Sequence, residues 1–294
     1  MPSCNVCSAA RVIKKILTDD NVQVLGVTSV EGELFVLLCR KTNPIAVYSI
    51  NDYQLLRHLH PPGHSTYFSI DLTSCVRHRC LYMSDHGHQC IHRYDLDSST
   101  WSDVSWWFRR SKWQVRGQFW KVWGLSVTPS CNLLVICPPA SFVVGFESSP
   151  WSNELVVLSA DSGQCVRQIS LQSDTEWSRH GVQLTTGHYV VCRGHRVCIV
   201  DDDGTVTRSY GGQCGSDVGQ LNEPCHLAVD EDSQFIFVAD CGNNRVVLLS
   251  PALEFVRYIS EGLSRPYRLH IHRATRRLYV GQSGGGGVVV IQLT

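Results

Sequence analysis

The stretch that decides the fold begins with Gln220-Leu221-Asn222-Glu223-Pro224-Cys225-His226-Leu227-Ala228-Val229-Asp230. It continues through Gln234-Phe235-Ile236-Phe237-Val238-Ala239-Asp240 and the turn Cys241-Gly242-Asn243-Asn244 into two further apolar runs, residues 245–249 and 255–259. Short apolar runs separated by Gly, Pro, Asn and Asp are typical of strands joined by tight turns. Residues 220–260 therefore predict an antiparallel meander of four strands.

The same order of runs and turns recurs along the chain. Each predicted first strand carries two apolar residues two positions apart, which strand alternation puts on one face. These pairs are Leu25/Val27, Ile70/Leu72, Leu125/Val127, Val182/Leu184, Leu227/Val229 and Leu269/Ile271. The units begin 42 to 57 residues apart, which suits four strands each and excludes solenoid repeats of about 20–30 residues.

The sixth unit contains three apolar runs before Thr294, whereas residues 11–17 read as a strand that belongs to no other unit. We expect this segment to complete the last sheet, because ring closure removes exposed strand edges. The predicted fold is all-β, a six-bladed β-propeller of four-stranded antiparallel blades whose last blade is closed by the N-terminal strand. Residues 1–10 form a tail and 11–294 the propeller, with blades near 22–60, 64–108, 117–172, 177–212, 220–260, and 264–294 plus 11–18.

Composition limits the classes of function. Hydrophobic residues make up 43% of the 294 residues and charged residues 18%, against about 25% charged in an average protein. A large core is therefore available, which excludes wholesale disorder. Because 26 basic residues balance 26 acidic ones, nucleic-acid binding driven by net charge is excluded, and any such activity needs a local patch.

The 14 cysteines mostly sit inside apolar, strand-like runs, where a thiol behaves as a small hydrophobe. No signal peptide or membrane-length apolar run is readable, so we expect reduced thiols in a cytoplasmic protein without membrane contact. Cys4-X-X-Cys7 lacks a second pair at zinc-site spacing and predicts no metal site.

Several motifs of residues 219–246 resemble a complete NHL repeat: Gly219-Gln220-Leu221-Asn222-Glu223-Pro224, Val229-Asp230, Phe237-Val238-Ala239-Asp240 and Asn243-Asn244-Arg245-Val246. Weaker echoes occur at residues 82–91 and 264–269. The chain is thus similar to the NHL propeller that ends tripartite-motif proteins. This resemblance implies a target-recognition role in a ubiquitin-ligase system. The RING, B-box and coiled-coil patterns of that family do not occur in these 294 residues, so a separate subunit or a longer parent protein would have to supply the ligase activity.

A propeller of this kind presents the loops before its first strands, and those between its second and third strands, on one face around the central channel. Arginine and aromatic residues on a concave surface are enriched among recognition hot spots. The sequence therefore predicts a non-catalytic interaction module that binds a protein or peptide partner on this face. The candidate residues are Trp120, Trp123, His180, His226, Arg245, Arg265, Tyr267 and Arg268.

A second candidate is a binding loop within residues 101–123, which hold six of the eight tryptophans. Cations beside aromatic faces can grip a partner or stack single-stranded bases; packing of an outer strand is the alternative for part of the stretch. The residues of this loop are Trp107, Arg109, Arg110, Lys112 and Trp113.

Single-stranded RNA binding is the alternative function, because residues 257–277 carry six arginines and two histidines against one acid, Glu261. Arg273, Arg276 and Arg277 are expected on the opposite face, which divides this basic patch.

A metal-dependent lyase or hydrolase is the third hypothesis. The peptide-amidating lyases, which resemble NHL proteins, bind zinc through histidines directly after the proline that starts a blade. Cys225 and Tyr267 hold those positions here, and His226 comes one residue later. Alternation would turn its side chain to the other face. We expect no catalytic residue, cofactor, metal or small-molecule substrate.

Overall fold

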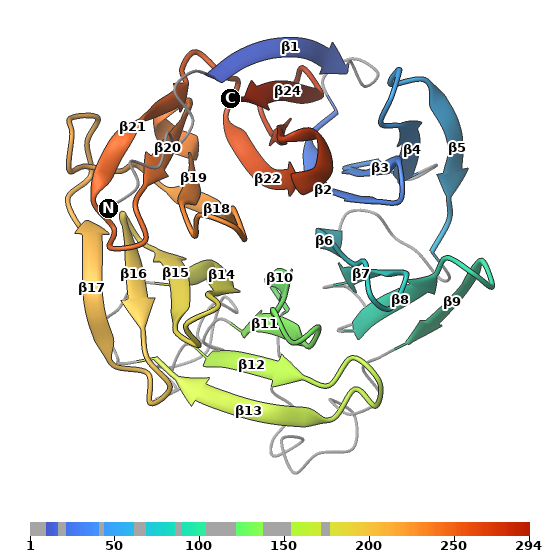
Figure 1. Ribbon diagram of the computed structural model, residues 1–294, viewed down its shortest axis with the longest axis horizontal. Helices are drawn as coiled ribbons and strands as arrows, with labels where there is room; N and C mark the ends of the chain where they lie inside the picture. The colour runs from blue at the N-terminus through green and yellow to red at the C-terminus, as the bar shows by residue number, and fades with distance from the viewer. Residues whose placement is uncertain are drawn as a thin grey trace, which may run out of the picture.

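The computed structural model describes residues 10–16, 22–40, 44–61, 69–85, 90–103, 122–137, 154–171 and 177–294. These residues form six four-stranded antiparallel sheets arranged in a ring (Figure 1). This arrangement confirms the predicted six-bladed β-propeller. Within the described ranges, no helix has the length and apolar character needed to cross a membrane.

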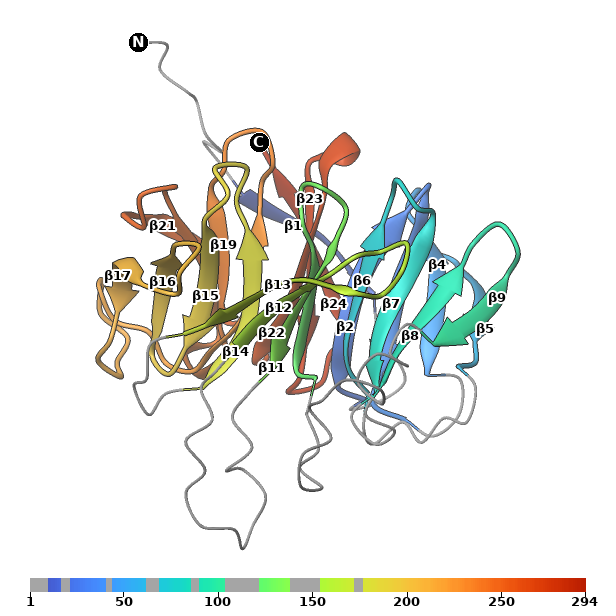
Figure 2. The ribbon, with the colours of Figure 1, turned by 90° about the horizontal axis from the view of Figure 1, so that it is seen from below.

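The strands follow the chain from blade to blade, and the first strand of each blade lies innermost (Figure 1). Figure 2 shows the same ring from the side, with its strands running between the two faces. Blade 1 consists of β2 (Val24–Val30), β3 (Glu33–Leu38), β4 (Ile45–Ser49) and β5 (Leu55–Leu59). Blade 2 consists of β6 (Ser69–Cys75), β7 (Cys80–Asp85), β8 (Cys90–Asp95) and β9 (Thr100–Asp103). Blade 3 consists of β10 (Gly124–Val127), β11 (Leu133–Cys137), β12 (Glu154–Leu158) and β13 (Cys165–Ser170). Blade 4 consists of β14 (Ser178–Gln183), β15 (Tyr189–Arg193), β16 (Arg196–Val200) and β17 (Val206–Gly211). Blade 5 consists of β18 (Pro224–Val229), β19 (Ile236–Asp240), β20 (Arg245–Leu249) and β21 (Phe255–Ser260). Blade 6 consists of β22 (Pro266–His272), β23 (Arg277–Gln282), β24 (Val288–Leu293) and β1 (Ala10–Ile16).

The N-terminal strand closes the ring, as the sequence predicts. β1 pairs antiparallel with β24, from Ala10 opposite Leu293 to Ile16 opposite Val288. Its central residues face solvent, whereas Ile16 is buried against blade 1 residues such as Val24 and Leu38. The outer edge of the last sheet is therefore covered by residues from the other end of the chain.

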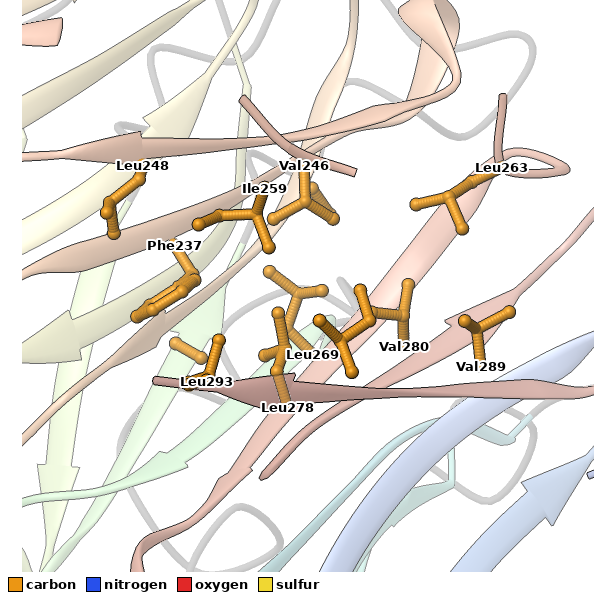
Figure 3. Packing of buried hydrophobic residues seen from close by; sticks show 13 residues of the cluster. Phe237, Val246, Leu248, Ile259, Leu263, Leu269, Leu278, Val280, Val289 and Leu293 are labelled. Atoms are coloured by element: carbon orange, nitrogen blue, oxygen red, sulfur yellow. The ribbon is translucent and has the colours of Figure 1, made fainter. Parts of the chain in front are cut away.

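The core lies between neighbouring blades, where one sheet face packs on the next. Between blades 5 and 6, Phe237 and Leu248 pack against Leu278, Val280 and Leu293 (Figure 3). Each of these side chains is buried, and burying a large aliphatic or aromatic side chain contributes roughly 1.5–3 kcal/mol. The predicted pair Leu269 and Ile271 packs in this same cluster, whereas Leu25 and Val27 pack in two different clusters.

The six innermost strands contact one another around the ring and line the central channel. We call the end where these strands begin the start face. The end that carries the hairpins between first and second strands is the hairpin face.

Candidate functional site

The channel contains a polar cluster that comes from one repeated position of the propeller. The pairing register of β14, β18 and β22 skips one residue immediately before His180, His226 and Arg268. A similar shift places Asp71 at the matching position of β6. Asp71, His180, His226 and Arg268 are all buried, so four blades each send one polar side chain into the channel.

These register shifts overturn the expectation for His226. Strict strand alternation would point the side chain of His226 to the face opposite that of Cys225, the residue that follows the blade-starting Pro224. A β-bulge inserts an extra residue and re-aims the side chains that follow it. Because Cys225 is that extra residue, His226 lies in the cluster, with its Nε2 3.8 Å from the Oδ2 of Asp71.

Asp71 connects three blades. Its Oδ1 accepts hydrogen bonds from the Nε of Arg268 at 2.9 Å and from the backbone N–H of Leu72, and its Oδ2 accepts one from the backbone N–H of Leu125. Burial raises the pKa of Asp71, while Arg268 and the two backbone N–H groups oppose that rise. The guanidinium of Arg268 also lies over the ring of Tyr267 at 4.1 Å.

Hydrogen bonds fix both histidines in one tautomer. The Nδ1 of His180 accepts from the backbone N–H of Leu227, and the Nδ1 of His226 accepts from that of Leu269, both at 3.3 Å. A neutral imidazole carries its proton on the other nitrogen when one nitrogen accepts, so Nε2 carries it in both rings. The Nε2 of His180 donates to the carbonyl of Leu125 at 3.1 Å. The rings stack with centroids 3.6 Å apart.

The two remaining blades place glycine at the repeated position. A Cβ added to Gly26 would lie 2.5 Å from the Cβ of Leu72, and one added to Gly124 would lie 2.6 Å from the carbonyl oxygen of Arg179. Neighbouring innermost strands therefore approach too closely at these two positions for a side chain. Asp71 lies on β6, between these two closely packed strands, and the other three cluster residues come from blades 4 to 6.

Asp71, His180 and His226 place three potential ligand atoms within 4.8 Å of one another, but the arrangement does not fit a metal ion. Each Nε2 carries a proton, so it has no lone pair for a cation, and each Nδ1 is occupied by a backbone N–H. The Arg268 guanidinium adds a positive charge beside the carboxylate. The cluster joins blades by hydrogen bonds.

The histidine pair predicts that stability falls in mild acid. Burial, with help from Arg268, lowers the pKa of His180 to about 3, and burial also lowers the pKa of His226. The unfolded chain binds these protons near pH 6.5, so stability is present above that pH and decreases below it. Between pH 7 and about 5.5, the pair should lower the free energy of unfolding by about 2.5 kcal/mol.

Denaturant unfolding at the two pH values measures this loss. Burial raises the pKa of Asp71, which works in the opposite direction, so His226→Gln provides the internal reference. This variant should lose about 1.3 kcal/mol of the pH dependence. Equal pH dependence of the variant and the wild type would show that His226 is not held neutral.

A cavity of about 750 Å³ extends from the histidine pair to the hairpin face. Its walls mix aliphatic side chains with hydroxyls, including Leu72, Leu125, Thr28 and Ser126. Residues from the hairpins of five blades line its mouth: Val76 and Arg77, Pro129 and Cys131, Thr185, Glu231 and Gln234, and Arg273. Its volume falls within the range of about 300–1,000 Å³ that is usual for ligand pockets.

Three of the residues predicted for the start face are not displayed there. His180, His226 and Arg268 are the cluster residues, with exposures of 2%, 7% and 3%. The prediction that they form an open surface is wrong, because the bulges turn them into the channel.

Arg245 is also buried and serves the fold. Its Nε donates to Asp240 at 2.7 Å, its Nη1 and Nη2 donate to backbone carbonyls of residues 216 and 220, and its guanidinium lies 4.4 Å from the ring centroid of Tyr258. Arg245 therefore anchors the loop before β18 and is not presented to a partner.

The described part of the start face retains Arg265, Tyr267 and Trp123. Arg265 is exposed and its Nη2 lies 3.5 Å from the carboxylate of Glu223. Trp123 is half-buried against Trp177, with ring centroids 6.2 Å apart.

A hydrogen bond with Cys225 lowers the pKa of the buried Cys241 to about 6, and Arg265 adds to this lowering. Trp120 and the predicted loop of Trp107, Arg109, Arg110, Lys112 and Trp113 lie outside the described residues.

The arginines of residues 257–277 are largely engaged within the protein. Arg273 pairs with Asp232 and Glu231, Arg276 with Asp230, and Arg265 with Glu223. Arg268 pairs with Asp71, and Arg277 donates to the carbonyl of Ile50. Neighbouring carboxylates thus neutralise most of the basic patch that suggested RNA binding.

Asp71 is a functional candidate in the channel that the sequence prediction did not include. It precedes Leu72 just as His226 precedes Leu227 and Arg268 precedes Leu269. Alignment of the first strands on the apolar residue would have placed the three polar residues at one position. In blades 1 and 2 the predicted pairs instead began two residues earlier than Val27 and Leu72, at Leu25 and Ile70.

No protein-family model and no curated protein match the sequence. Among solved structures, a streptogramin B lyase is similar at 9% identity with a TM-score of 0.61, covering 99% of this chain and 100% of that chain. A catalytically inactive variant of virginiamycin B lyase from Staphylococcus aureus, solved with quinupristin, has 8% identity and a TM-score of 0.58, with coverage of 97% and 100%. The β-propeller domain of Myceliophteria thermophila Cps50 (Swd1) has 10% identity and a TM-score of 0.60, with coverage of 92% and 83%. Similarity at these identities establishes the β-propeller fold of the chain.

Proposed function

We propose that the protein is a non-catalytic binding module whose central cavity receives a segment of a protein partner from the hairpin face. The observation that carries this proposal is the state of the histidine pair at the inner end of the cavity. General acid–base catalysis needs a group that can gain or lose a proton near neutral pH. His180 and His226 are buried, neutral and hydrogen-bonded at Nδ1, so they suit shape recognition better than proton transfer.

The mouth of the cavity supports a polypeptide ligand. Val76, which is 66% exposed, stands beside the exposed Arg77 at the rim. Glu231 and Arg273 pair on the opposite side of the ring. A rim that offers an apolar contact and charges of both signs complements a mixed peptide sequence. It is less suited to a uniformly anionic strand, which needs a continuous basic surface.

A bulky substitution inside the cavity tests the proposal. Thr73 is half-buried on β6 and lines the cavity, so Thr73→Trp should occupy space that a partner segment needs. Peptides selected on the wild-type protein from a random display library should bind Thr73→Trp at least about tenfold more weakly in fluorescence anisotropy, a loss of about 1.4 kcal/mol.

Val166→Trp is the matched control, because Val166 is 58% exposed on the outer strand β13. This variant should bind the selected peptides as the wild type does. Equal binding by Thr73→Trp would place the peptide site outside the cavity and contradict the proposal. Failure to enrich any peptide on the wild-type protein would also count against it.

A further inference from the structure

Blade 2 contains a second group of metal-ligating side chains, separate from the channel cluster. Asp85 ends β7 and lies directly opposite Cys90, the first residue of β8, and His92 follows two positions along the same strand. Residues two apart on a strand share a face. The three side chains are buried, with exposures of 0%, 4% and 4%, and their ligand atoms lie within 4.8 Å of one another.

Comparison with blade 5 shows how the repeat has been changed here. In blade 5 the corresponding aspartate, Asp240, lies opposite Arg245 and forms a buried ion pair with it. In blade 2 the position opposite Asp85 is held by Cys90. Blade 2 therefore has the thiol of Cys90 where blade 5 has the guanidinium of Arg245, and the imidazole of His92 lies beside that thiol.

The spacing of the donors suits a tetrahedral zinc ion. The Nε2 of His92 lies 3.3 Å from the Oδ2 of Asp85 and 3.3 Å from the Sγ of Cys90. Zinc bonds of about 2.0–2.2 Å to nitrogen and oxygen and about 2.3 Å to sulfur place neighbouring ligands of a tetrahedron about 3.3–3.6 Å apart. The two distances from the Nε2 of His92 therefore match edges of such a site within a few tenths of an ångström, and the remaining pair, Asp85 and Cys90, lies within 4.8 Å.

Charge and nitrogen orientation separate this group from the channel cluster. One carboxylate and one thiolate neutralise a divalent cation, which lowers the cost of burying it. The nitrogen of His92 that faces both other donors is Nε2, whereas Nδ1 lies farther away, at 4.0 Å from the Sγ of Cys90. His92 can therefore ligate through Nε2 while Nδ1 retains the ring proton.

We propose that Asp85, Cys90 and His92 form a zinc-binding site that ties β7 to β8. Binding deprotonates Cys90 and releases that proton to solvent, so affinity should rise with pH. A site of this kind stabilises its blade and is independent of the cavity.

Metal titration of the whole chain tests the site. Protein freed of metal with a chelator should bind one equivalent of Zn²⁺ in calorimetry. Co²⁺, used as the spectroscopic probe, should produce a thiolate-to-metal charge-transfer band together with the visible bands of tetrahedral cobalt. Zn²⁺ at a hundredfold excess over its Kd should raise the melting temperature by roughly 5 °C.

Two variants with one cysteine removed give the decisive comparison. Cys90→Ala should abolish the cobalt charge-transfer band and the rise in melting temperature. Cys80→Ala, which removes a buried thiol from β7 of the same sheet, should retain both. Absence of Zn²⁺ binding to the wild-type chain would overturn the proposal even if Cys90→Ala did not fold. A charge-transfer band that persisted in Cys90→Ala would also overturn it.

Discussion

Removal of residues 1–16 should lower the free energy of unfolding by at least about 5 kcal/mol, because it strips the outer strand from the last blade. The shortened chain loses the burial of Ile16 and the backbone hydrogen bonds between β1 and β24. Burial of an isoleucine contributes roughly 1.5–3 kcal/mol and each net hydrogen bond about 0.5–1.5 kcal/mol. Thermal unfolding followed by circular dichroism should show a melting temperature at least about 10 °C lower.

Addition of the missing segment in trans makes this prediction specific to the strand. A synthetic peptide of residues 1–16 should restore most of the melting temperature of the shortened chain. The substitution Val12→Thr, at a residue 44% exposed on β1, should leave the full chain unchanged. A shortened chain that melted at the wild-type temperature would contradict closure of the ring by β1.

The second large effect is expected at the centre of the propeller. Asp71→Leu should destabilise the fold by about 3–5 kcal/mol, because it leaves the charge of Arg268 buried without its carboxylate partner. The backbone N–H of Leu125 would lose its acceptor at the same time. Chemical denaturation should measure the loss as a lower midpoint with an unchanged slope.

The double variant Asp71→Leu/Arg268→Met distinguishes a broken ion pair from a badly packed leucine. Replacement of both members of a buried pair by apolar residues is often close to neutral. The double variant should therefore be more stable than Asp71→Leu alone. If it were equally unstable, packing would explain the loss and the pair would not be its cause.

The fold could be predicted from the sequence because its signals are local. The paired apolar residues of each first strand and the Gly, Pro, Asn and Asp turns recur six times, and each repeat supports the interpretation of the next. The closing strand was predictable for a related reason. Residues 11–17 had the pattern of a strand and no other unit to join.

The candidate sites could not be predicted as readily, because they depend on register and on contacts across the ring. A bulge at Cys225 reverses the face on which alternation places His226. Asp71 meets Arg268 only when the ring closes. The group of Asp85, Cys90 and His92 depends on pairing of β7 with β8, which an isolated motif search does not detect. The partners of Arg245 in the loop before β18 lie 25 and 29 residues away in the sequence, so no local motif indicates them.

The most direct test of the account is the protonation state of the histidine pair, measured by NMR of the intact protein with nitrogen-labelled imidazoles. The variants His180→Gln and His226→Gln assign the signals. The account predicts that both rings carry their proton on Nε2 and remain neutral from pH 7 down to about 5, since the pKa of His180 is lowered to about 3 and that of His226 is also lowered. Titration of either ring near pH 6.5, or a proton on Nδ1, would contradict it.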